Sequence, residues 1–89
     1  MGVLRHPDTI ESGSLVSVRY MDHALQRNVE PEKAQPIIRE AIGRVETQKS
    51  EYLYLVVDEY TEVDGRSAGQ RKTTGFVILK STILEINRL

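Results

Sequence analysis

The segment that most constrains the fold of this chain is EYLYLVVDEY, residues Glu51–Tyr60. From position 52 to position 57, Tyr, Tyr and Val at the even positions alternate with Leu, Leu and Val at the odd ones. A short apolar run rich in aromatic and β-branched residues is typical of a β-strand, whose successive side chains point to opposite faces. Both faces of this strand are apolar, which indicates a strand that is covered on both sides or lies at an interface.

Three other segments have the composition of strands. They are Ser14–Met21, Thr74–Leu79 and Thr82–Leu89, all rich in β-branched and aliphatic residues. Only Lys80-Ser81 separates the last two, which is enough for a tight corner and too short for a helix. The sequence therefore predicts a mainly-β fold.

Residues 30–45 admit two interpretations. Apolar residues recur at helical spacing from Ala34 to Val45, but Pro36 inside such a helix would cost about 3 kcal/mol or more. The stretch AIGRVETQKSEYLYL also reads as two strands joined by a turn near Gln48–Ser50. We prefer a short helical segment within residues 30–40 followed by a strand from about Ala41 to Thr47, and the helical alternative stays open.

The size of the chain predicts a single small domain over residues 1–89, with a flexible N-terminal segment at residues 1–12. A chain of 89 residues buries only about 60–65% of its unfolded surface, so its core is small. It has no cysteine, which excludes disulfides and leaves oligomerisation as one remaining source of stability. We expect a cytoplasmic protein, because the sequence shows neither a signal-peptide pattern nor a membrane-spanning apolar run.

The polar loop DGRSAGQRKTTG, residues 64–75, contains the G-x-S-x-G spacing of a hydrolase nucleophile elbow. That motif requires a strand before the serine and a helix after it, and neither His nor Asp follows Gly69 to complete a triad. The loop also lacks the G-x-x-x-x-G-K-[ST] spacing of a phosphate loop. We therefore predict no catalytic residue, Ser67 included, no metal site and no cofactor, so the protein is not expected to be an enzyme.

Two short motifs lie in the second half of the chain. Gly43 and Val45 are followed by the L-x-L pair Leu53 and Leu55, and the segment LKSTILEI spans residues 79–86. Through these motifs residues 41–88 resemble the Sm and Sm-like family of small β-barrels, and LKSTILEI is similar to the family's second motif with Lys80-Ser81 in place of Arg-Gly. The resemblance implies a small, strongly bent antiparallel barrel of about five strands, and SH3-like barrels share the same alternation.

The resemblance also implies a homo-oligomer that binds single-stranded RNA. The Asp and Asn of the family's nucleotide pocket have no match here, whereas Lys80 stands at the position of its arginine. From the basic and aromatic side chains we expect the RNA-binding residues to be Lys80, Lys49, Arg71, Lys72 and Tyr52. The C-terminal strands form an unprotected edge, for which the expected oligomer-interface residues are Phe76, Ile78, Ile83 and Ile86.

The alternative function is a protein-interaction adaptor or structural module of the same fold with no nucleic-acid activity. A net charge of −1 favours this alternative, since a nonspecific nucleic-acid coat needs an excess of cations. The basic residues of the polar loop favour RNA. The partner would be another protein in one case and single-stranded RNA in the other.

Overall fold

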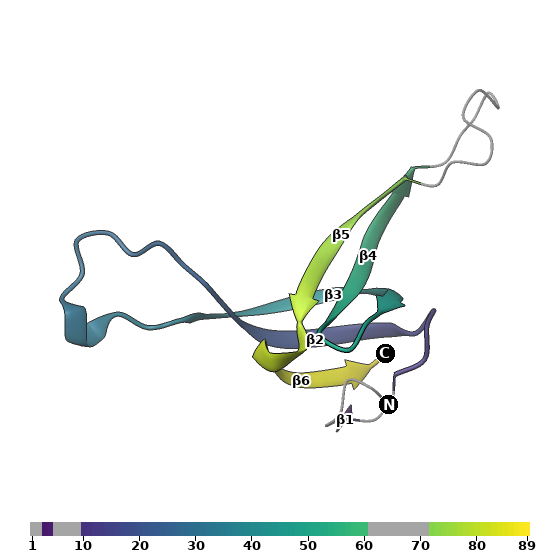
Figure 1. The fold of residues 1–89 in the computed structure, drawn as a ribbon, viewed down its shortest axis with the longest axis horizontal. Helices are drawn as coiled ribbons and strands as arrows, with labels where there is room; N and C mark the ends of the chain where they lie inside the picture. Colours follow the sequence, from purple (N-terminus) through teal and green to yellow (C-terminus); the bar gives the residue numbers. More distant parts are fainter. Residues whose placement is uncertain (1–2, 5–9, 61–71) are drawn as a thin grey trace.

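The computed structural model describes residues 3–4, 10–60 and 72–89, and these form one antiparallel β-sheet (Figure 1). Its strands are β1 (Val3–Leu4), β2 (Leu15–Asp22), β3 (Ile37–Gln48), β4 (Tyr52–Tyr60), β5 (Lys72–Leu79) and β6 (Ile83–Arg88). Two single turns of 3-10 helix, η2 (Pro31–Lys33) and η3 (Lys80–Thr82), complete the described secondary structure. The prediction of a small, mainly-β fold is confirmed.

The order of strands across the sheet is β1-β6-β2-β3-β4-β5. The chain runs back and forth from β2 to β5, and η3 then turns it so that β6 lies beside β2. The tight corner predicted at Lys80-Ser81 is confirmed, because both residues belong to η3. The predicted closure into a barrel is wrong for the described strands, since β5 ends the order and none of them pairs with its outer edge. Closure requires a fixed stagger between strands, which the alternation of side chains does not encode.

The ambiguous middle of the chain is a strand. β3 begins at Ile37, four residues before the predicted start, and ends at Gln48, where the predicted turn begins. The helical interpretation of residues 34–45 is wrong, and helical structure in this region is limited to η2 within the predicted interval 30–40. Pairing with β2 on one side and β4 on the other outweighs the helical spacing of the apolar residues.

The core lies on one face of the curved sheet and is entirely aliphatic. Its fully buried side chains come from five strands at every second position: Val16, Val18, Val45, Leu53, Leu55, Ile78 and Ile86. Ile10 joins them from the N-terminal segment, and the Gln48 side-chain amide donates a hydrogen bond to its carbonyl oxygen. Of the segment predicted to be flexible, Val3–Leu4 pairs with β6, while residues 1–2 and 5–9 lie outside the described residues.

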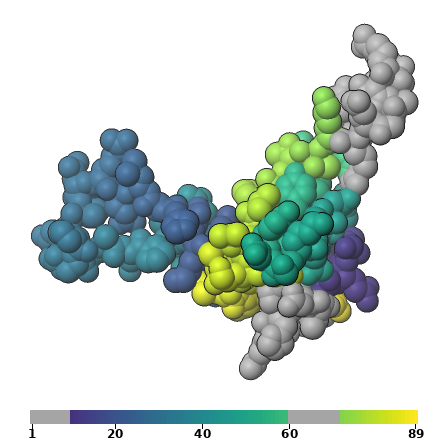
Figure 2. Space-filling model, viewed as in Figure 1, coloured from purple at the N-terminus to yellow at the C-terminus, as the bar shows by residue number. Residues whose placement is uncertain are grey.

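A long arm, residues 23–36 between β2 and β3, projects away from the core (Figures 1 and 2). All residues from position 27 to position 40 are exposed, so the arm lies outside the core and the start of β3 contacts the sheet mainly through its pairing with β2. The radius of gyration is 16.1 Å, against about 12 Å for a compact domain of this length. No helix in the described part of the chain is long and apolar enough to cross a lipid bilayer.

Candidate interaction surface

An apolar patch covers the face of β4 and β5 that points away from the core. Leu53, Leu55 and Ile78 are buried in the core, so the side chains next to them along each strand lie on the opposite face. We call this surface the outer patch, and it consists of Tyr52, Tyr54, Val77 and Leu79. Tyr54 lies directly opposite Val77, and Tyr52 directly opposite Leu79.

The outer patch is exposed where it reaches β5. Val77 exposes 64% of its surface and Leu79 exposes 49%, whereas the two tyrosines are half-buried. The phenolic oxygen of Tyr54 lies 2.9 Å from Oγ1 of Thr73, and this hydrogen bond holds the ring across β5. Thr47, the two tyrosines and Val77 line an open hollow of about 320 Å³. The patch is therefore an apolar surface with polar groups at its margin.

β5 adds an unpaired strand edge beside this patch. Every second backbone N–H and C=O group of an edge strand points outward, where another strand can bind it. Between Lys72 and Lys80 the strand reads TTGFVIL, with no charge and no proline. Phe76 on the core side of β5 is also 44% exposed. The described part of β5 thus has none of the charge or proline devices that normally protect an edge.

The predicted RNA-binding residues fall into two groups. Lys49, Tyr52 and Lys80 meet at one corner, where the Lys49 N–H donates to the Tyr52 carbonyl and the Lys80 N–H donates to the Glu51 carbonyl, both at 2.8 Å. Lys72 lies opposite Tyr60 at the other end of β5, about 23 Å from Leu79 at the rise of an extended strand. Arg71 lies outside the described residues.

Several other cations of the described chain lie next to carboxylates. The ion pairs are Arg39–Asp22 at 2.8 Å, Lys33–Glu30 at 3.0 Å, Arg44–Glu59 at 3.1 Å and Arg19–Glu85 at 3.9 Å. These pairs neutralise the arginines that project from β2 and β3. Lys72 and Arg88, two further exposed cations of the described chain, lie on β5 and β6.

The predicted interface residues differ in how far the single chain buries them. Ile78 and Ile86 are buried in its core, and Ile83 packs against that core, so these three side chains stabilise the folded chain itself. Phe76 is the one member of the predicted set that is classed as exposed. The alternation of β5 identifies two faces, but the sequence alone does not say which one faces inward. Val77 and Leu79, on the other face, are the residues that sequence reasoning missed.

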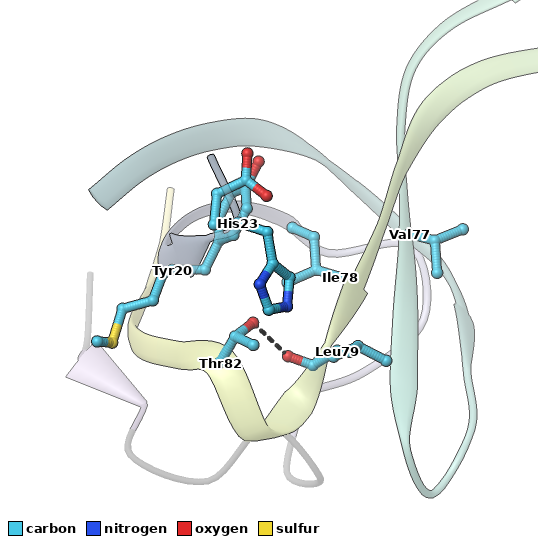
Figure 3. Close-up of a pocket in the computed structure, with 8 residues that line it drawn as sticks. Tyr20, His23, Val77, Ile78, Leu79 and Thr82 are labelled. Atoms are coloured by element: carbon cyan, nitrogen blue, oxygen red, sulfur yellow. Dashed lines mark hydrogen bonds between the residues drawn. The ribbon is translucent and has the colours of Figure 1, made fainter. Parts of the chain in front are cut away.

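A second hollow of about 190 Å³ lies between the end of β2 and the end of β5 (Figure 3). The His23 ring points into it, and Thr82 Oγ1 donates a 2.7 Å hydrogen bond to the Leu79 carbonyl at its wall. Val77, Ile78 and Leu79 of β5 line this hollow together with residues 20–23 at the end of β2. No group of three His, Cys, Asp or Glu side chains within residues 3–4, 10–60 and 72–89 could hold a metal ion. Ser67 and the rest of the elbow motif lie outside the described residues.

Comparison with known proteins gives no relative from which a function could be carried over. The chain matches no family model, no curated protein and no solved structure. A function must therefore be inferred from four surface features: the outer patch, the edge of β5, the arm, and the corner where Lys49, Tyr52 and Lys80 meet.

Proposed function

We propose that this protein is a non-enzymatic interaction module that associates with copies of itself through its β-sheet. The observation that carries the proposal is the position of the outer patch directly beside the unpaired edge of β5. Exposed apolar patches mark interaction sites, and an unprotected strand edge supplies backbone hydrogen bonds to a partner strand. The two features together provide both affinity and a defined orientation.

The small size of the core supports the same proposal. The core contains ten buried apolar side chains, whereas Leu25, Val29, Ile38 and others on the arm and on β3 remain in water. Small domains often obtain the missing stability by oligomerisation. Burying apolar surface between copies would add to the free energy of folding at about 25 cal/mol per Å².

Light scattering coupled to size-exclusion chromatography tests self-association. We expect a mass that is a multiple of 10.1 kDa at tens of micromolar and that falls toward the monomer on dilution. A monomeric mass throughout that range would contradict the proposal. In that case we would instead infer an adaptor that binds a different protein through the outer patch.

RNA binding is a second candidate function, favoured by the corner that brings Lys49, Tyr52 and Lys80 together. Lysine and tyrosine are side chains that bind single-stranded nucleic acid, through phosphate contact and base stacking respectively, and the backbone brings the three residues to the same corner. The resemblance of residues 41–88 to Sm-like proteins supports this candidate as well. The paired arginines of β2 and β3 and the overall charge weigh against it.

Filter binding with a mixed single-stranded RNA pool distinguishes the two candidates. If the corner binds RNA, affinity falls steeply with salt, and the double substitution Lys49→Ala with Lys80→Ala weakens binding at low salt. Arg27→Ala on the arm is the matched control, since it removes an exposed cation far from the corner. Retention that is absent at low salt, or equal in both variants, excludes this candidate.

A further inference from the structure

We propose that two copies of the chain pair antiparallel through their β5 edges, about a two-fold axis that passes beside Val77. This inference rests on the proposed function and specifies its interface.

β5 is suited to pair with a second copy of itself. The described strands leave its outer edge unpaired, and from residue 73 to residue 79 that edge carries no charge. A strand with acidic or basic side chains would introduce an unbalanced charge beside Val77 and Leu79, whereas β5 itself would not. Antiparallel pairing of a strand with its own copy is also closed, so it ends at a dimer.

Symmetry allows few registers. Side chains directly opposite each other in an antiparallel pair lie on the same face of the sheet. A two-fold axis perpendicular to the sheet therefore matches core-facing positions with core-facing positions, and outer positions with outer positions. The axis must then pass beside one residue and its own copy. The central positions of β5 offer Gly75, Phe76 and Val77.

The side chains that each register would place opposite one another favour the axis beside Val77. An axis beside Phe76 places Lys72 of one copy opposite Lys80 of the other, which brings like charges together at both ends. An axis beside Gly75 places Lys72 opposite Ile78, so a cation meets an aliphatic side chain. An axis beside Val77 avoids both problems. It pairs Val77 with Val77, Phe76 with Ile78, Leu79 with Gly75 and Thr74 with Lys80.

This register also joins the two outer patches. Val77 and Leu79, the most exposed members of the patch, lie at the edge that pairs, and the tyrosines of both copies flank them. Leu79 of one copy lies beside Gly75 of the other, next to the Tyr54 ring that covers this glycine. The dimer therefore covers the apolar surface of β5 and continues each sheet into its partner.

Cysteine cross-linking tests the register, because the natural chain contains no cysteine. In Val77→Cys the two thiols face each other across the axis, at a separation that a disulfide can bridge. In Phe76→Cys the two thiols are diagonal neighbours about 7–8 Å apart, beyond easy bridging. Leu84→Cys places an exposed thiol on β6, which β2, β3 and β4 separate from β5 in the strand order. All three are oxidised mildly at tens of micromolar and resolved on non-reducing gels.

We expect Val77→Cys to form a covalent dimer at least tenfold faster than the other two variants. Faster cross-linking of Phe76→Cys would overturn the register, and equal slow cross-linking of all three would overturn the β5 interface. In both cases, an oligomeric mass by light scattering would still support self-association as the proposed function. A monomeric mass would contradict self-association as well as the β5 interface. Val77→Lys is a second test, because it changes an exposed side chain and should leave the circular dichroism spectrum unchanged. We expect the Val77→Lys protein to be a monomer and the control Leu84→Lys to remain a dimer.

Discussion

Gly75 on β5 lies so close to Leu55 on β4 that a Cβ atom at position 75 would be 1.9 Å from the Leu55 carbonyl oxygen. The same Cβ atom would lie 2.9 Å from Cε1 of Tyr54. No side chain fits in this space, because the nearest obstacle is backbone that the β4–β5 ladder holds in place. The glycine therefore allows β5 to pack closely against β4 beneath the tyrosine ring.

Gly75→Ala should lower the free energy of unfolding by about 1–3 kcal/mol or more, since the added methyl group must displace the Leu55 carbonyl. Urea unfolding followed by circular dichroism measures the change. Thr74→Ala is the matched control, because Thr74 is the exposed neighbour on the same strand and its loss should cost less than about 1 kcal/mol. Equal effects of the two substitutions would show that β4 and β5 are not packed as described.

Ile10 tests whether the N-terminal segment is part of the folded core. Its side chain is only 3% exposed and contacts the core cluster, so Ile10→Ala should cost about 2–5 kcal/mol. Leu15→Ala, at a side chain that is half exposed, should cost far less. A flexible segment would instead make Ile10→Ala the milder of the two in thermal or urea unfolding.

The hydrogen bond between Tyr54 and Thr73 should contribute measurably to the β4–β5 pair. Tyr54→Phe removes the phenolic oxygen from this partly buried contact and should cost about 0.5–1.5 kcal/mol. A double-mutant cycle with Thr73→Val isolates the interaction, since residues in direct contact give non-additive changes. Additive changes would mean that the two side chains do not interact in solution.

Local sequence patterns predict most of the strands of this fold. The alternation in residues 51–60 and the two-residue gap at Lys80-Ser81 place β4, β5, η3 and β6 to within about two residues at each end. The start of β3 at Ile37 was not predictable, because Ile37 and Ile38 also fit a helical spacing and only pairing with β2 decides between them. Barrel closure depends on distant strands in the same way, so no local pattern shows whether the sheet closes.

The candidate surface was predicted only in part. The sequence placed an unprotected edge on both C-terminal strands, whereas in the structure β6 pairs with β1 and with β2. Two of the four residues expected at the interface, Ile78 and Ile86, are buried in the core. When both faces of a strand carry hydrophobic residues, the residue types do not show which positions face the core. Of the five residues expected to bind RNA, Lys49, Tyr52 and Lys80 lie around one corner of the backbone, whereas Lys72 lies at the other end of β5. The arm has no local signal either, since its exposed residues reflect a lack of contacts with the core.

Amide hydrogen exchange of residues 72–79, compared at tens of micromolar and below one micromolar, tests the β5 interface most directly. Amides of β5 that point away from β4 are open to water in a monomer and become hydrogen-bonded in the proposed dimer. We predict that these amides exchange markedly more slowly at the higher concentration, and that Val77→Lys abolishes the difference. Exchange that does not depend on concentration, in a chain whose other strands stay protected, would contradict pairing at β5.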